Sequence, residues 1–204
     1  ALGFVRSLAR PGGNLTGAVT LGSELIPIRL ELMRELMPDQ KRIALIVIPA
    51  SPVTDGVAQN ARLAASRLAI ELRTYEASDP SLIDTAFEHM ASDGVRALVI
   101  SSDGLFINQA AKLAALCARR SIGAVFQNRS FAAAGGLASY GGGFSEAYRL
   151  AGAYAGRILK GEKPADLPVQ QATRIELVLN LNTAQSLGLT IPITLLGRAD
   201  EVIE

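Results

Sequence analysis

The alternation of apolar runs with helical patterns between residues 41 and 128 is the feature that most limits the fold of this chain. Four short predicted strands, the first of them a continuous β-branched run, are separated by three patterns with helical spacing. Such alternation is typical of βαβ units, in which helices join parallel strands and cover the sheet. It therefore predicts an α/β fold with a Rossmann-like parallel sheet. We expect strands at residues 41–48, 70–75, 97–100 and 122–126, and helices at about 54–68, 80–90 and 105–120.

The chain changes pattern on either side of this region. Before it, residues 2–9 show helical spacing that stops at the breaker cluster 10–13. After it, a glycine-rich break precedes a long amphipathic pattern. The further expected elements are a strand at 14–21, a helix at 24–36, a helical turn at 131–134, a strand at 136–140, a helix at 145–160, a strand at 174–179 and a short helix in the tail 183–204.

Composition excludes several classes of protein. Of the 204 residues, 49% are hydrophobic and 19% are charged, a balance that favours a folded core over disorder. The formal net charge is +1 and the basic residues are scattered, so we expect no nucleic-acid partner. The sequence has no run of about 18 apolar residues, which argues against a membrane span. Charges within residues 1–10 argue against a signal peptide there.

The sequence contains no recognisable pattern for catalysis or metal binding. Cys117 is the only cysteine and His89 the only histidine, so neither an internal disulfide nor a zinc cluster can be built from them. A nucleophile elbow and the glycine pattern of a dinucleotide-binding loop are both missing. We therefore expect no cofactor, no metal and no enzymatic activity.

Polar side chains follow the predicted strands at the points where the strands end. In open parallel sheets, ligands bind beyond the carboxyl ends of the strands. Hydroxyls, amides and helix N-termini at such ends can bind the carboxylate or ammonium group of a small solute. Tyr140 ends a further predicted strand just before three glycines. The candidate ligand-binding residues are Ser51, Ser101, Ser102, Asp103, Asn128, Arg129 and Tyr140.

These candidates also have purely structural interpretations. Asp103 could pair with a ligand ammonium, or residues 101–103 could cap the helix that begins near Leu105. Arg129 could clamp a carboxylate with two hydrogen bonds, or it could form a salt bridge at the surface or between the lobes. The ring of Tyr140 could stack on a ligand or pack inside the protein. The sequence leaves these alternatives open.

Six segments of the chain carry a family resemblance. They are ARPGGNLTG at 9–17, RLELMRELMP at 29–38, AGGLASYG at 134–141, KGEKPADLPV at 160–169, NLNTAQSLGLTIP at 180–192 and LGRADEVI at 196–203. Together they resemble the extracytoplasmic substrate-binding proteins of ABC transporters, in the subfamily that includes tryptophan-binding members. The segment at 180–192 is the most specific, and the six are spread over nearly the whole chain.

This resemblance implies a type I periplasmic-binding-protein fold, in which two Rossmann-like lobes joined by three crossings close on a ligand. Carried onto this chain, it makes residues 23–130 plus 180–204 a complete second lobe. Residues 1–22 plus 135–178 become the remainder of the first lobe. Members normally carry further residues before Ala1, which supply the first strands of that lobe. An incomplete first lobe with exposed sheet edges would favour pairing of two copies.

The resemblance also implies a function. The chain would be the solute-binding component of an ABC importer, periplasmic or attached to the cell surface, and would deliver its ligand to a membrane permease. The ligand would be an amino acid or an aromatic or other organic acid, bound in a cleft between the lobes. Two alternatives stay open: a ligand-sensing regulatory domain of the same fold, and a fragment that does not bind ligand alone.

Overall fold

The computed structural model describes residues 3–51, 54–142 and 144–204, and it divides into two compact units. The larger unit comprises Gly22–Gly141 and Glu176–Glu204, and the smaller unit comprises Ala1–Leu21 and Gly142–Ile175. The backbone therefore passes between the units three times. Residues 135–141, which the sequence assigned to the first lobe, fall in the larger unit because they contribute to its sheet.

A seven-stranded sheet forms the centre of the larger unit, with the strand order β3-β2-β4-β5-β6-β8-β9 in the described residues. The first five strands in this order pair in parallel, which confirms the predicted parallel α/β sheet. The strands are β2 (Arg42–Val47), β3 (Glu71–Glu76), β4 (Ala97–Ile100), β5 (Gly123–Phe126), β6 (Ala138–Gly142), β8 (Ile175–Asn180) and β9 (Glu201–Ile203).

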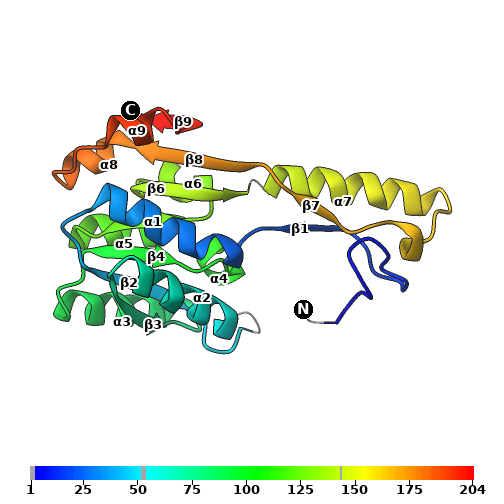
Figure 1. The fold of residues 1–204 in the computed structure, drawn as a ribbon, viewed down its shortest axis with the longest axis horizontal. Helices are drawn as coiled ribbons and strands as arrows, with labels where there is room; N and C mark the ends of the chain where they lie inside the picture. Colours follow the sequence, from blue (N-terminus) through cyan, green and yellow to red (C-terminus); the bar gives the residue numbers. More distant parts are fainter. Residues whose placement is uncertain (1–2, 52–53, 143) are drawn as a thin grey trace. The chain divides into compact units, whose positions relative to one another are not determined.

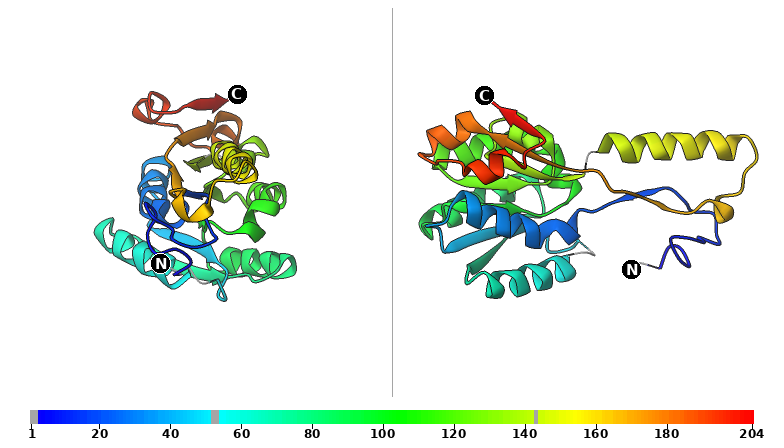
Figure 2. Two further views of the ribbon diagram at one scale, coloured as in Figure 1. Left: turned by 90° about the vertical axis from the view of Figure 1, so that its right-hand side faces the viewer. Right: turned by 45° about the horizontal axis from the view of Figure 1, so that its top comes forward.

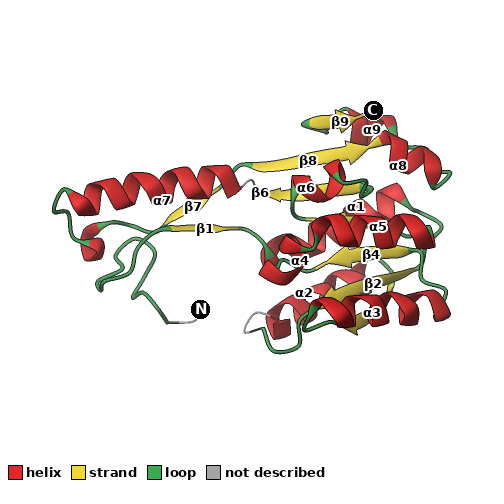
Figure 3. Ribbon diagram, turned by 180° about the vertical axis from the view of Figure 1, so that it is seen from behind, coloured by secondary structure: helices red, strands yellow, loops and turns green. Residues whose placement is uncertain are grey.

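The last two strands of the sheet are reversed relative to the other five. β8 and β9 are parallel to each other. The backbone N–H of Asn180, at the end of β8, donates to the carbonyl of Leu137, just before β6 begins. The arrows of β6 and β8 accordingly point in opposite directions in Figures 1 and 3. Sheet order and strand reversal were not predicted from the sequence.

Helices cover both faces of this sheet (Figures 1 and 3). On β2, Leu45 faces the core shared with Met33, whereas its neighbour Ile46 faces the core shared with Phe87. This alternation explains why β2 is almost entirely apolar: a strand between two helical layers is buried on both sides. One face is covered by α1 (Ile26–Leu36), α2 (Thr54–Arg67), α8 (Leu181–Ser186) and α9 (Ile193–Leu196), and the other by α3 (Pro80–Ser92), α4 (Gly104–Asn108), α5 (Ala110–Arg120) and α6 (Arg129–Ala133).

Three local details differ from the sequence prediction. The single helix expected at 105–120 is divided at Gln109, which has φ −105° and ψ 16° and so leaves the helical conformation. A short 3₁₀ turn, Ser23–Leu25, precedes α1. Residues 3–9 are not helical, so the prediction of a helix there was wrong. The Arg6 N–H donates to the Pro11 carbonyl instead, at 3.1 Å.

The smaller unit contains a two-stranded parallel sheet of β1 (Ala18–Thr20) and β7 (Gln170–Ala172) in its described residues. Helix α7 (Phe144–Leu159, yellow) runs beside both strands in Figures 1 and 2. Buried Tyr154 joins the helix to the following segment, because its hydroxyl donates to the Pro168 carbonyl at 2.7 Å. A 3₁₀ turn, Pro164–Asp166, lies in that segment.

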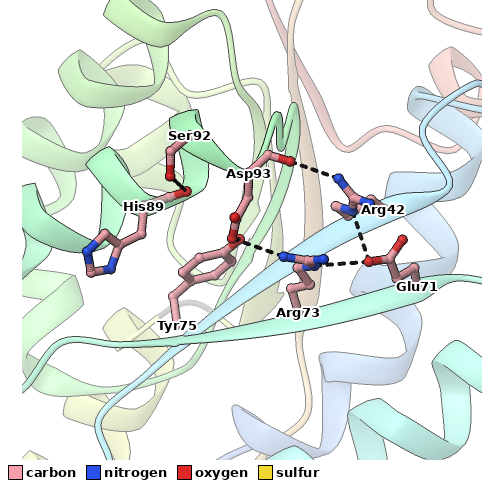
Figure 4. A network of polar contacts seen from close by, with 7 residues as sticks. All are labelled: Arg42, Glu71, Arg73, Tyr75, His89, Ser92 and Asp93. Carbon is pink, nitrogen blue, oxygen red and sulfur yellow. Dashed lines mark hydrogen bonds and ion pairs between the residues drawn. The ribbon is translucent and has the colours of Figure 1, made fainter.

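A network of charged side chains lies at the amino-terminal side of β2 and β3 (Figure 4). Glu71 accepts hydrogen bonds from the Nε atoms of Arg42 (3.0 Å) and Arg73 (2.9 Å). Asp93 accepts from the hydroxyl of Tyr75 at 2.7 Å and pairs with Arg73 at 3.2 Å. The network therefore ties the edge strand β3 to β2 and to the end of α3.

We expect this network to make the stability of the larger unit sensitive to acid. Hydrogen bonds from Arg42 and then Arg73 lower the pKa of Glu71, and the hydrogen bond from Tyr75 lowers the pKa of Asp93. Groups with a lowered pKa in the folded state stabilise it above their ordinary values, 4.5 and 3.8, and lose that contribution as the pH falls. The melting temperature should therefore fall as the pH is lowered below about 4.5.

A pair of thermal melting series tests this expectation. The double variant Glu71→Gln with Asp93→Asn should show a shallower fall of the melting temperature with acid than the wild-type protein. Glu88→Gln, which changes an exposed carboxyl of α3 outside the network, should leave the slope unchanged. Identical slopes for the double variant and the wild type would show that the network does not act in this way.

Candidate functional site

The carboxyl ends of β4 and β5 bring buried polar side chains to one edge of the larger sheet. Ser101 follows β4 directly and Gln127 follows β5 directly, and both side chains are buried. Because these strands are parallel neighbours, the two residues lie at the same edge of the sheet. This is the edge at which the sequence placed the candidate ligand contacts.

Arg29 is the charged residue at the centre of this region. It lies on α1 and its side chain is 0% exposed. Its Nε donates to the Tyr140 carbonyl at 2.8 Å, and its Nη1 donates to the Ser102 hydroxyl at 2.9 Å. Arg29 thus joins the loop after β4 to strand β6, on either side of β5. Its Nη2 is buried and has no hydrogen-bond partner among the described residues.

Burial leaves the guanidinium of Arg29 in an unfavourable electrostatic environment. Desolvation lowers the pKa of Arg29 to about 9, so the group still carries its proton at neutral pH. Its two hydrogen-bond partners, a hydroxyl and a backbone carbonyl, are neutral. Moving a charge out of water is costly unless an opposite charge accompanies it. The site therefore favours an anion.

Two glycines allow the backbone to approach this group of side chains closely. A Cβ on Gly22 would lie 2.9 Å from the Cβ of Ser102 and 3.1 Å from Oε1 of Gln127. A Cβ on Gly141 would lie 2.4 Å from the backbone oxygen of Gln127. Because Gly22 has no side chain, its backbone can lie against both Ser102 and Gln127. We call Arg29, Ser102, Gln127 and Tyr140 the Arg29 cluster.

The structure gives two of the predicted residues roles in this cluster. Ser102 accepts the hydrogen bond from Nη1 of Arg29, and Tyr140 takes part through its carbonyl. Ser101 is buried, and its backbone N–H donates to the Ile46 carbonyl at 3.1 Å. Ser51 is half-buried in a turn after β2, beside residues 52–53, which lie outside the described ones.

The other three predicted residues have structural contacts, and for Asp103 and Arg129 these are the alternatives that the sequence left open. Asp103 is the N-cap of α4 and accepts from the Leu105 N–H at 3.4 Å. Asn128 is the N-cap of α6 and accepts from the Ser130 N–H at 2.9 Å. A role in ligand binding remains a prediction for both, since a capping oxygen has a second lone pair.

Arg129 forms a two-point ion pair with Glu201 at the surface. Its Nε donates to Oε2 of Glu201 at 2.6 Å, and Nη2 contacts the other carboxylate oxygen. The pair holds α6 against β9, the last strand of the sheet. This is the salt bridge that the sequence left open, and a carboxylate ligand would have to replace Glu201 to bind there.

The sequence prediction missed Arg29, although the pattern contained a signal for it. Leu25, Arg29, Leu32 and Leu36 recur at helical spacing, so Arg29 occupies a position on the apolar face of α1. A charged residue at such a position is either buried with partners or at the margin of the core. The structure shows that it is buried.

Other kinds of chemistry find no support in the described part of the chain. It contains no group of three or more His, Cys, Asp or Glu residues placed to hold a metal ion. Burial raises the pKa of the Cys117 thiol, so this cysteine is not a reactive thiolate. Among the described residues, no helix is long and apolar enough to cross a membrane.

Comparison with known proteins identifies the family. A family model described as ABC transporter substrate binding protein matches residues 1–203. The chain belongs to this family. A curated relative, the tyrosine-binding protein of Clostridioides difficile (strain R20291), is 24% identical over 187 residues. The match covers 92% of this chain and 53% of the relative, so the chain spans about half the length of that protein.

Two solved structures are similar to nearly the whole of this chain. The Streptococcus pneumoniae ABC domain in complex with L-Trp is 25% identical, with a TM-score of 0.86, and the match covers 98% of this chain and 68% of that one. A conserved domain protein from Vibrio cholerae O1 biovar El Tor is also 25% identical, with a TM-score of 0.87, covering 97% and 66%. This ABC substrate-binding protein has the type I periplasmic-binding-protein fold, as its resemblance implied.

Proposed function

We propose that this chain is part of the solute-binding component of an ABC importer. A small organic solute, either an amino acid or an aromatic or other organic acid, would bind between the two lobes and be delivered to a permease in the membrane. The protein would act in the periplasm or attached to the cell surface. The names of its relatives support this class of solute, since one is a tyrosine-binding protein and another was solved with L-Trp.

The observation that carries the proposal is the polar carboxyl edge of the larger sheet in a member of this family. Ser101 and Gln127 directly follow adjacent parallel strands there, and Ser102 and Gln127 both lie close to Gly22. Hydroxyl and amide groups at this edge suit a solute with carboxylate and ammonium groups. Asp103 would accept from the ammonium group, and the ring of Tyr140 would pack against the solute. Ser51, Asn128 and Arg129 would contribute further contacts.

Ligand-dependent thermal stability of the full-length protein tests this function. We expect L-tyrosine or L-tryptophan to raise the melting temperature, because a ligand at 100 times its Kd stabilises the folded state by about 2.7 kcal/mol. Ribose serves as the uncharged control. The absence of stabilisation by any compound in a panel of amino acids and aromatic acids would contradict the proposal.

Asp103→Asn separates ligand recognition from capping in the same assay. Asparagine keeps an oxygen that can accept from the Leu105 N–H, so the helix cap is preserved. The variant should therefore fold normally and bind a zwitterionic solute at least about tenfold more weakly, a loss of about 1.4 kcal/mol. Equal affinities of the variant and the wild-type protein would show that Asp103 only caps the helix.

A further inference from the structure

The Arg29 cluster contains a positive charge and hydrogen-bond donors, but its contacts among the described residues do not include an anion. The guanidinium has five N–H donors. Nε donates to a carbonyl and Nη1 donates once to a hydroxyl, and Nη2 has no partner among the described residues. Buried polar groups in folded proteins are nearly always hydrogen-bonded, so an unpaired charged donor at this depth calls for a partner.

Neighbouring groups can donate to the same partner. The Ser102 oxygen accepts from Arg29, which leaves the hydroxyl proton free to be donated elsewhere. The Gln127 side chain is held close to Ser102 by Gly22, and its amide nitrogen provides two more donors. Three donor groups of one cluster are therefore available at the carboxyl edge of the sheet.

The geometry of a guanidinium selects among anions. Its planar fork matches the two oxygens of a carboxylate, and such paired, charge-assisted hydrogen bonds are shorter and stronger than neutral ones. Arg29 is fully buried on α1 and forms two hydrogen bonds, so its side chain is held in place before an anion arrives. A fixed, desolvated cation favours a solute that carries a carboxylate over the same solute without it.

We infer that Arg29, together with the Ser102 hydroxyl, binds the carboxylate of the solute and determines the selectivity of this protein for acids over the corresponding amines. Because Nη2 is buried in this structure, entry of the carboxylate requires side chains around Nη2 to move. The inference rests on the proposed solute-binding function, and it adds the group that is recognised and the residue that recognises it.

Calorimetric titration of the full-length protein with L-tyrosine and with tyramine, its decarboxylated amine, tests this role. The wild-type protein should bind L-tyrosine more than about tenfold more tightly than tyramine. Arg29→Gln should remove this difference because it weakens the binding of L-tyrosine and leaves the binding of tyramine unchanged. Arg29→Lys should restore part of the difference. Arg198→Gln is the matched control, because Arg198 pairs with Glu35 at the surface and should not alter the preference. An unchanged preference in Arg29→Gln would overturn the inference.

A second probe, acetate, distinguishes failure of this inference from failure of the proposed solute-binding function. If the wild-type protein binds neither compound, the proposed function fails for this solute, and acetate then tests Arg29 directly. Sodium acetate should raise the melting temperature above that in sodium chloride of equal ionic strength, and Arg29→Gln should abolish the difference. Equal melting temperatures in the two salts would overturn the inference.

Two measurements cover the case in which Arg29 variants do not fold. Ser102→Ala leaves the guanidinium in place and should reduce the preference for L-tyrosine over tyramine. In the wild-type protein, the Nε–H resonance of Arg29, assigned by through-bond correlation, should shift on titration with acetate. A preference that survives in Ser102→Ala, with no shift of this resonance, would likewise overturn the inference.

Discussion

Replacement of Phe87 by alanine is expected to lower the free energy of unfolding of the larger unit by about 3–5 kcal/mol. Phe87 lies on α3, its side chain is 0% exposed, and it packs in the core with residues of β2 and β4 such as Ile46 and Leu98. Truncation removes the buried ring and leaves a cavity that the surrounding helices and sheet fill only in part.

Urea denaturation measures this loss as a lower midpoint with an unchanged slope. Leu82→Ala on the same helix is the control, because the Leu82 side chain is 39% exposed and its truncation should cost less than about 1 kcal/mol. Equal losses for the two variants would show that α3 does not pack on the sheet through Phe87 as described.

Alanine at position 141 is expected to destabilise the larger unit by about 1–3 kcal/mol or more. The added Cβ would lie 2.4 Å from the backbone oxygen of Gln127 and 3.0 Å from its Cα. These are backbone atoms at the end of β5, so no rotation of a side chain relieves the contact. Either β5 or β6 has to shift, and a shift of β6 displaces the Tyr140 carbonyl to which Arg29 donates.

Gly56→Ala is the matched control for this substitution. Gly56 lies in α2, and no atom beyond its chain neighbours and the backbone of its own helix lies within 4 Å of the added Cβ, so alanine there should stabilise the unit by about 0.4–1 kcal/mol. Thermal melting and the affinity for the solute should be measured together. Wild-type stability and affinity in Gly141→Ala would contradict the close approach of β5 and β6.

The parallel part of the sheet was predictable because its information is local. β2, β4 and β5 are short apolar runs bounded by turn residues, and each intervening helix has its own spacing. The reversal of β8 was not predictable, since the direction of a strand depends on which distant strand it joins. The reversal is visible in the hydrogen bond from the Asn180 N–H to the Leu137 carbonyl. These two residues are far apart in the sequence.

The location of the candidate site was predictable, but the roles of its side chains were not. Topology alone places a polar residue that follows a parallel strand at the carboxyl edge of the sheet. The side-chain oxygen of Asp103 or Asn128 can serve either as a helix cap or as a ligand contact, so the residue type does not show which role it has. Arg29 was missed because its partners, Ser102 and Tyr140, lie 73 and 111 residues away. No short segment of the sequence contains Arg29 together with either partner.

The two outer strands of the larger sheet, β3 and β9, have a consequence for behaviour at high concentration. An unpaired strand edge is a template on which other molecules can add strands and aggregate. β3 carries Glu71, Arg73 and Glu76 along its length, and β9 has only three residues and is fixed by the ion pair of Glu201 with Arg129. Neither edge offers a long apolar strand, so the larger unit resists growth into aggregates by strand addition.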